Sequence, residues 1–391
     1  MTRPWLIVTG DFSRTGGMDR ANLALAERLA ERDIPVHLVC HAADERLVEH
    51  PLVTLHQAPR PAGMHFPASF LLSRTARSVA GRLPDAVVVA NGGNLSWSGV
   101  NWIHYLHAAW DGPVQGLGLR SWKQRLERRI ERRREAQAVP QAQVVICNSR
   151  LTAEQAADRL NVPEDRLHVI YYGADAERFP LVTPDERQRM RSQLKIQPQQ
   201  LCLAFVGALG DHRKNFDTLF ESWRRLHADT EWRNAVLLVI GHGAQLPQWQ
   251  QRARDCGLGE SIRFLGFRRD VYAVLAACDL LVHPARYEAF GLSPYEALCR
   301  GVPVLVSATA GVAEVIPDAL SPLLLSSPDD ADELVAKLRG WREQREQLAD
   351  DVIALSDQCR SRSWNDMADE IIAAGHETCS SATTPIPVAN V

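Results

Sequence analysis

Short apolar runs alternate with longer stretches of helical periodicity along most of this 391-residue chain. Runs that are apolar on both faces are typical of parallel strands covered by helices on either side. Two such series are present, so we expect an α/β protein with two doubly wound parallel sheets. The runs of the first series are 5–10, 35–40, 86–91, 143–149 and 167–173, and those of the second are 201–209, 235–243, 262–267, 279–284 and 302–307.

The polar stretch 181–200 separates the two series and is the best candidate for a linker. We therefore assign 1–180 to the first domain and 181–360 to the second, and we expect the tail 377–391 to be disordered. Ligands of open α/β sheets bind at the carboxyl ends of the strands. If the two domains face each other, the site lies in the cleft between them.

Composition restricts the class of protein. Hydrophobic residues make up 46% and charged residues 23% of the chain, and the net charge is −3, which gives no reason to expect a nucleic-acid partner. No apolar run is long enough for a spanning helix, and the run at 5–10 has no leader cleavage site after it. None of the eight cysteines forms a CxxC pair, which favours a reducing, cytoplasmic location.

The stretch YEAFGLSPYEALCRGVPV, residues 287–304, has two structural interpretations. In the first, Ser293 is the N-cap of a helix and Glu296 reaches back to it as a capping box. In the second, Gly291 lies between a strand and a helix N-terminus, where backbone N–H groups bind an anion and Glu288 faces the ligand. The residues by themselves leave both interpretations open.

The same stretch resembles the EX7E signature of the retaining glycosyltransferases of family GT4, which have the GT-B fold. The resemblance extends from about residue 5 to about residue 375. It implies two Rossmann-like domains that face each other across a cleft, with a final helix, about 361–376, that crosses back to the first domain. The matching residues are Glu288, Phe290, Gly291, Leu292, Glu296, Ala297, Gly301, Pro303 and Val304.

The resemblance also implies roles for these residues. Glu296 would bind the nucleotide ribose, and the backbone near Gly291, Leu292 and Ser293 would face the donor phosphates or sugar. Glu288 would contact the sugar hydroxyls and stabilise the positive charge that develops at the anomeric carbon. Phe290 belongs to the same donor-binding motif.

A second motif follows the strand 201–209. A departing diphosphate needs positive charge, and the resemblance places Lys214 on the phosphates, with Arg213 beside it as a further candidate. The family's usual arginine is replaced by Ala208. We expect Arg213 or His212 to compensate, because otherwise the phosphate clamp is weakened.

Three further places resemble family positions. Gly16 and Gly17 match a glycine turn where a donor phosphate or the acceptor comes close to the backbone. YLHAA resembles a segment with a histidine near the donor sugar, which favours His107 over His104. Arg268 lies in a loop that resembles the surroundings of the nucleotide base.

The segment 120–137 is rich in arginine and lysine, with glutamates interleaved at helical spacing. One interpretation is a solvated helix whose charges pair along its own surface. The alternative is a peripheral contact with anionic lipid head groups at the inner face of a membrane, which would bring the enzyme to a lipid-linked acceptor.

Together these features predict a metal-independent hexosyltransferase without a cofactor. It would move a sugar, with retention, from a UDP- or GDP-sugar to a hydroxyl of a glycan, lipid-linked or small-molecule acceptor, such as a cell-envelope polysaccharide. The resemblance implies that the departing phosphate accepts the proton. The alternatives are a nucleotide-sugar epimerase, a sugar phosphorylase, or a nucleotide-binding homologue without activity.

Overall fold

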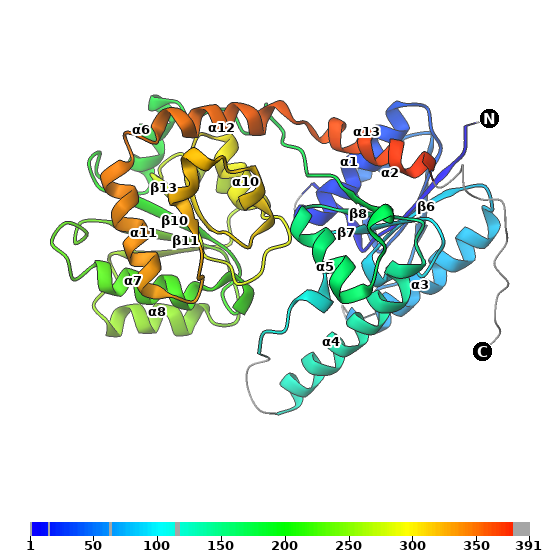
Figure 1. The fold of residues 1–391 in the computed structure, drawn as a ribbon, viewed down its shortest axis with the longest axis horizontal. Coiled ribbons are helices and arrows are strands. Elements are labelled where there is room, and N and C mark those ends of the chain that lie inside the picture. Colours follow the sequence, from blue (N-terminus) through cyan, green and yellow to red (C-terminus); the bar gives the residue numbers. More distant parts are fainter. Residues whose placement is uncertain (1, 15, 62–64, 114–117, 378–391) are drawn as a thin grey trace. The chain divides into compact units, whose positions relative to one another are not determined.

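The structure is a computed structural model that describes residues 2–14, 16–61, 65–113 and 118–377. The chain forms two compact units (Figure 1). Unit 1 consists of Met1–Gly173 with Trp364–Val391, and unit 2 consists of Ala174–Ser363. The unit boundary therefore falls seven or so residues before the predicted domain boundary at 180. The tail predicted to be disordered lies, from residue 378 on, outside the described residues.

Unit 1 contains a seven-stranded parallel sheet in the order β5-β3-β1-β6-β7-β8-β9 and a small β2-β4 pair. The strands are β1 (Trp5–Val8), β2 (Asp11–Phe12), β3 (Val36–Cys40), β4 (Ala42–Ala43), β5 (Val53–Gln57), β6 (Val87–Asn91), β7 (Val100–Ile103), β8 (Val144–Cys147) and β9 (Leu167–Val169). The helices are α1 (Gly17–Glu31), α2 (Glu45–Val48), α3 (His65–Arg82), α4 (Leu119–Ala138), α5 (Arg150–Leu160) and α13 (Trp364–Glu377).

Unit 2 contains a six-stranded parallel sheet in the order β12-β11-β10-β13-β14-β15. The strands are β10 (Cys202–Val206), β11 (Val236–Ile240), β12 (Ile262–Gly266), β13 (Leu280–His283), β14 (Val304–Ser307) and β15 (Leu324–Leu325). The helices are α6 (Pro184–Gln193), α7 (Phe216–Leu226), α8 (Leu246–Asp255), α9 (Val271–Leu275), α10 (Leu292–Cys299), α11 (Ala331–Gln344) and α12 (Ala349–Ser361).

The predicted fold class is confirmed in both units, because each main sheet is parallel and lies among helices. Strands β1, β6, β11 and β13 are buried along their whole length, as the unbroken apolar runs predicted. In unit 1, side chains of α3 and α5 complete two separate cores on the sheet. The sequence pattern worked here because a strand covered on both faces has no polar side to interrupt it.

The predicted linker at 181–200 is wrong, because Pro184–Gln193 forms α6 within unit 2. Thr183 caps this helix by accepting a hydrogen bond from Glu186 N at 3.2 Å. The buried Arg191 also ties α6 to the turn before β13 by donating to the carbonyl of Ala277, at 2.9 Å. The polar composition of this stretch does not distinguish a packed surface helix from a linker, because the contacts that hold the helix are tertiary.

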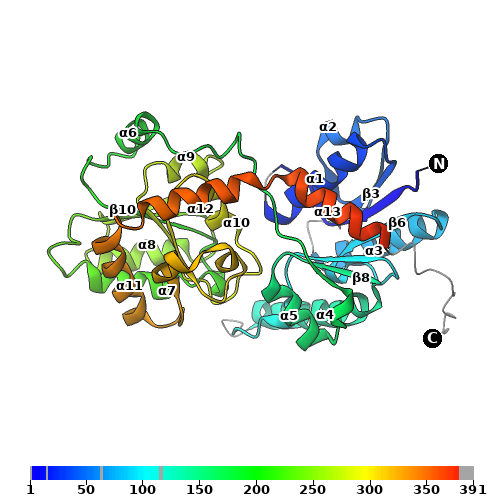
Figure 2. The ribbon, with the colours of Figure 1, turned by 45° about the horizontal axis from the view of Figure 1, so that its top comes forward.

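The last helix, α13, lies beside α1 in both ribbon views (Figures 1 and 2). Arg28 of α1 donates hydrogen bonds of 2.7 and 2.9 Å to the two carboxylate oxygens of Asp369 on α13. Gly375 lies so close to Trp5 that an added Cβ would be 2.3 Å from the indole ring. The chain therefore returns from unit 2 to complete the packing of unit 1.

Candidate active site

The candidate site of unit 2 lies where the strand order of its sheet reverses. Strands β10 and β13 are parallel neighbours, and the chain continues outward from β10 in one direction and from β13 in the other. Such a switch point leaves a crevice at the carboxyl ends of the two strands. The segments that leave these ends, 207–215 and 284–291, carry the residues predicted to bind the donor.

A buried ion pair joins these two segments. Lys214 Nζ donates to Glu288 Oε2, and His283 Nε2 lies 3.1 Å from the same oxygen. The side chains of Lys214 and Glu288 are only 25% and 16% exposed, and that of His283 is 1% exposed. The structure thus brings together two predicted site residues that are 74 positions apart in the chain, and adds a histidine that the sequence argument missed.

The electrostatics of this group keep Glu288 charged. Burial by itself raises the pKa of Glu288, but the Lys214 charge and the His283 hydrogen bond outweigh it and leave the pKa well below its ordinary value. Burial lowers the pKa of His283, so the ring is neutral. Because a carboxylate only accepts hydrogen bonds, the ring proton of His283 is on Nε2, which donates a hydrogen bond to Glu288.

Arg213 has a different partner from Lys214. Its Nε and Nη2 donate to Asp211 Oδ1 and Oδ2 at 2.9 and 2.6 Å. Burial raises the pKa of Asp211, but the bonds from Arg213 outweigh it and the pKa is lowered. The expected compensation for Ala208 by Arg213 therefore competes with an ion pair already formed inside the same loop.

Helix α10 begins differently from the capping-box interpretation. Its N-cap is Gly291, with φ of 108°, and no side chain caps it. The predicted N-cap at Ser293 is wrong, since Ser293 lies inside the first turn. The positive φ favours glycine, and a Cβ on Gly291 would be a tight 3.0 Å from Pro294 Cγ and 3.2 Å from Glu288 Cγ. The first N–H groups of α10 then have no acceptor within the helix.

The remaining residues of the motif differ in exposure. Glu296 and Ser293 are half-buried on α10. Leu292 is half-buried at the first position of the helix. Phe290 is only 1% exposed and packs edge-on against Tyr295, with ring centroids 5.3 Å apart. Phe290 therefore supports the turn from inside the core.

Arg268 follows β12 and forms an ion pair with Asp270, through contacts of 2.8 and 2.6 Å. It stays close to the surface, beside the 71% exposed Phe267. Nothing in unit 2 joins it to the Lys214–Glu288 pair through a hydrogen bond between described side chains.

Two glycines of the loop after β11 contact the Lys214 loop through backbone alone. A Cβ on Gly241 would lie 1.9 Å from the carbonyl oxygen of Gly207, and one on Gly243 would lie 1.8 Å from that of Leu209. Leu209 N also donates to His242 O at 3.1 Å. This backbone contact between the loop after β11 and segment 207–215 is visible only in the structure.

The other predicted site residues lie in unit 1. Gly16 is the N-cap of α1, with φ of 91°, and Gly17 is the first residue of that helix. His107 begins a short 3-10 turn, His107–Ala109, and its ring packs edge-on against Tyr105. His104 is buried, with its ring nitrogens near Tyr172 Oη and Asn22 Nδ2, and burial lowers its pKa to about 3.

Among the described residues, no group of three or more His, Cys, Asp or Glu side chains is arranged to hold a metal ion. Lys214 supplies positive charge at the carboxyl ends of β10 and β13, together with the amino-terminal dipole of α10. The site can therefore bind an anionic ligand and can place a carboxylate, Glu288, beside it.

Comparison with known proteins places this geometry in a family. The profile described as "Glycosyl transferases group 1" matches residues 186–354, and the profile described as "Glycosyltransferase Family 4" matches residues 15–178. A D-inositol 3-phosphate glycosyltransferase from Stackebrandtia nassauensis is 26% identical over 398 residues, which cover 94% of this chain and 87% of that protein.

Solved structures show the same fold. WaaG, a glycosyltransferase involved in lipopolysaccharide biosynthesis, matches with a TM-score of 0.76 at 20% identity, over 94% of this chain and 98% of that one. HepE of Anabaena, solved in complex with UDP and glucose, matches with a TM-score of 0.69 at 20% identity, over 97% and 100% of the two chains. The two-domain Rossmann-like architecture is confirmed by these matches.

Proposed function

Because the chain belongs to the family 4 glycosyltransferases and is a nucleotide-sugar glycosyltransferase, we propose that Lys214, Glu288 and the start of α10 form its donor site. The observation that carries the proposal is the buried Lys214–Glu288–His283 group at the switch point of unit 2. In a nucleotide-sugar the diphosphate and the sugar are joined at the anomeric carbon. A neighbouring ammonium and carboxylate suit such a donor, because the ammonium can bind the diphosphate while the carboxylate faces the sugar.

The proposed reaction divides the work between these groups. Lys214 and the N–H groups of Leu292 and Ser293 bind the diphosphate, and charge-assisted bonds of this kind contribute about 1.5–3 kcal/mol each. Glu288 remains ionised and stabilises the positive charge that develops at the anomeric carbon as the bond to phosphate breaks. The acceptor hydroxyl attacks from the same face, and the departing phosphate takes its proton, which gives retention.

The donor is a UDP- or GDP-sugar, and the UDP complex of HepE makes UDP the first nucleotide to test. A melting-temperature screen of UDP, GDP and ADP identifies the base, because a ligand in excess over its Kd raises the melting temperature. Product analysis with a labelled donor then tests the reaction. A transferase releases nucleoside diphosphate in step with a glycoside of the donor's anomeric configuration. Epimerised donor, free sugar phosphate, or binding without turnover would each contradict the proposal.

Replacing Glu296 by glutamine is expected to weaken nucleotide binding about tenfold or more, because a charge-assisted hydrogen bond to the ribose becomes a neutral one. Titration calorimetry with the nucleotide from the screen measures this Kd. Glu343→Gln, an exposed position on α11, is the matched control and should leave the Kd unchanged. Equal affinities for Glu296→Gln and the parent protein would remove Glu296 from the donor site.

Helix α4 supports the proposed contact with an anionic membrane. Trp122 and Leu126 are 64% and 41% exposed on it. Arg125, Arg129 and Arg133 line a hollow of about 330 Å³ along the helix, and none of them makes an ion pair among the described residues. Among the described side chains of α4, the ion pairs along the helix are Lys123–Glu127 at 3.8 Å and Arg134–Glu131 at 3.7 Å. None of the helices in the described part of the chain has the length and apolar character needed to cross a bilayer.

Reversing these three charges, as Arg125→Glu with Arg129→Glu and Arg133→Glu, should lower binding to phosphatidylglycerol vesicles on the order of a hundredfold, since each basic residue contributes about 1 kcal/mol. Vesicle flotation at low salt measures the binding. The matched control reverses Arg233, Lys337 and Arg345 of unit 2, which also make no ion pair among the described residues. Flotation of all variants at the parental level, or none for the parent, would exclude the contact.

A further inference from the structure

A buried carboxyl group holds the backbone of the segment that begins with His107. Glu135 of α4 is only 2% exposed. Its Oε1 accepts from His107 N at 2.8 Å, and its Oε2 accepts from Ala108 N at 3.0 Å. These are the first N–H groups of the 3-10 turn His107–Ala109, so one side chain caps the whole turn.

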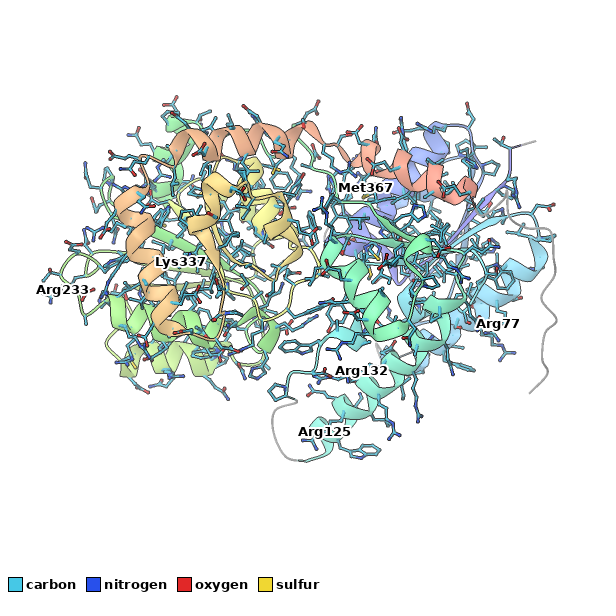
Figure 3. All side chains as sticks on the ribbon, in the orientation of Figure 1. Arg77, Arg125, Arg132, Arg233, Lys337 and Met367 are labelled. Atoms are coloured by element: carbon cyan, nitrogen blue, oxygen red, sulfur yellow. The ribbon has the colours of Figure 1, made fainter. Side chains whose placement is uncertain are left out.

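The same face of α4 holds the carbonyl groups of this segment, 107–112. Arg132 donates to His107 O at 3.0 Å and also to Trp110 O. One turn earlier on the helix, Arg128 donates to Gly112 O at 2.5 Å. Figure 3 labels Arg132 beside this segment, and Arg125 nearer the amino-terminal end of α4. Three side chains of one helix therefore fix five backbone groups of a single short segment.

This arrangement is costly if its only purpose is to fold a surface turn. Burial raises the pKa of Glu135 to about 8, even though the two backbone N–H groups lower it. The charged neighbours on its own helix are Glu131, which raises the pKa, and Arg132, which lowers it. A serine or asparagine within the turn would cap it without burying an ionisable group. Ionisable groups whose pKa is shifted by burial are concentrated at functional sites.

We propose that Glu135 is a positioning residue, which sets the backbone of His107 so that its ring is held in the orientation used in sugar transfer. The inference rests on the proposed function and on the place near the donor sugar that the family resemblance implies for His107, and it deepens them, because it assigns a role to a residue that does not touch the substrate itself. Arg132 and Arg128 complete the clamp from the carbonyl side. The contacts that Glu135 and Arg132 make with His107 go to its backbone N and O atoms, so they fix the point from which the ring projects.

The test compares Glu135→Gln in two backgrounds. Glutamine has one acceptor oxygen in place of two, so one of the two N–H bonds is lost. We expect kcat to fall about tenfold or more, since a small displacement near the reacting atoms is expensive, while the donor KM changes less than twofold. In a His107→Ala background the same change should have no further effect on kcat, because the residue acts through His107.

Glu127→Gln is the matched control, since it makes the same chemical change on the same helix at a residue paired only loosely with Lys123, at 3.8 Å. It should leave kcat unchanged. If Glu135→Gln does not fold, Arg132→Met tests the clamp from the carbonyl side with the same prediction. An equal loss of kcat in both backgrounds, or no loss in the parent, overturns the inference. If His107→Ala itself keeps parental kcat, the proposed role of His107 in transfer fails instead.

Discussion

Replacing Lys214 by alanine is expected to lower kcat at saturating donor about a hundredfold or more, because one preorganised charge on the departing diphosphate is lost. The same change should destabilise unit 2 by about 3 kcal/mol, since it leaves the carboxylate of Glu288 buried without its partner. For a unit of this size that corresponds to a fall in Tm on the order of 10 °C. Kinetics and calorimetric melting measure the two effects separately.

The pH dependence of Tm tests whether the unpaired Glu288 carboxylate causes the loss of stability in Lys214→Ala. In the parent protein the pKa of Glu288 is lowered, so its contribution to stability is fully present above its ordinary value of 4.5 and is lost as the pH falls toward the lower folded value. In Lys214→Ala only the His283 hydrogen bond still opposes burial, so the pKa of Glu288 rises and protonation of its carboxylate at lower pH stabilises the variant. The difference in Tm should therefore be large at pH 7 and shrink toward pH 5.

Lys337→Ala is the control for Lys214→Ala, because Lys337 lies on α11 and forms no ion pair among the described residues. It should keep parental kcat and Tm. The double variant Lys214→Ala with Glu288→Gln tests the stability effect, since it removes the buried unpaired charge and should recover most of the Tm; its kcat stays low because both residues belong to the proposed donor site. A Lys214→Ala protein with parental kcat would remove the lysine from the donor site.

Replacing Gly243 by alanine is expected to destabilise unit 2 by about 2–4 kcal/mol and to weaken nucleotide binding at the same time. The new Cβ would lie 1.8 Å from the carbonyl oxygen of Leu209 and 2.6 Å from its carbonyl carbon. These are backbone atoms, which cannot rotate away as a side chain can, so the loop that carries Lys214 must move. Denaturant unfolding and nucleotide titration measure the two losses.

Gly340→Ala is the matched control for this prediction. Gly340 lies inside α11, and a Cβ there would meet no atom within 4 Å. Alanine should stabilise that helix by about 0.5–1 kcal/mol and leave nucleotide binding unchanged. If Gly243→Ala unfolds at the parental denaturant concentration, the close approach of the two loops does not hold Lys214 in place.

Much of the candidate site in unit 2 could be predicted because its residues follow strands. The runs 201–209 and 279–284 predicted β10 and β13, and the residues after them, Lys214 and Glu288, lie at one edge of the sheet. The start of α10 was predicted less well. Ser293 and Glu296 have the spacing of a capping box, but the positive φ of Gly291 starts the helix two residues earlier. Backbone conformation at one glycine outweighed side-chain preference.

The sequence by itself determined which segments become buried strands and helices and in what order, because burial on both faces leaves an apolar run that can be read locally. Only the tertiary structure decided which residues of different elements contact one another. It placed His283 against Glu288, the backbone of Leu209 against Gly243, and Glu135 against His107. These contacts join residues from different elements, and no periodicity records them, because they depend on where the strand order reverses and on which helix passes beside which loop.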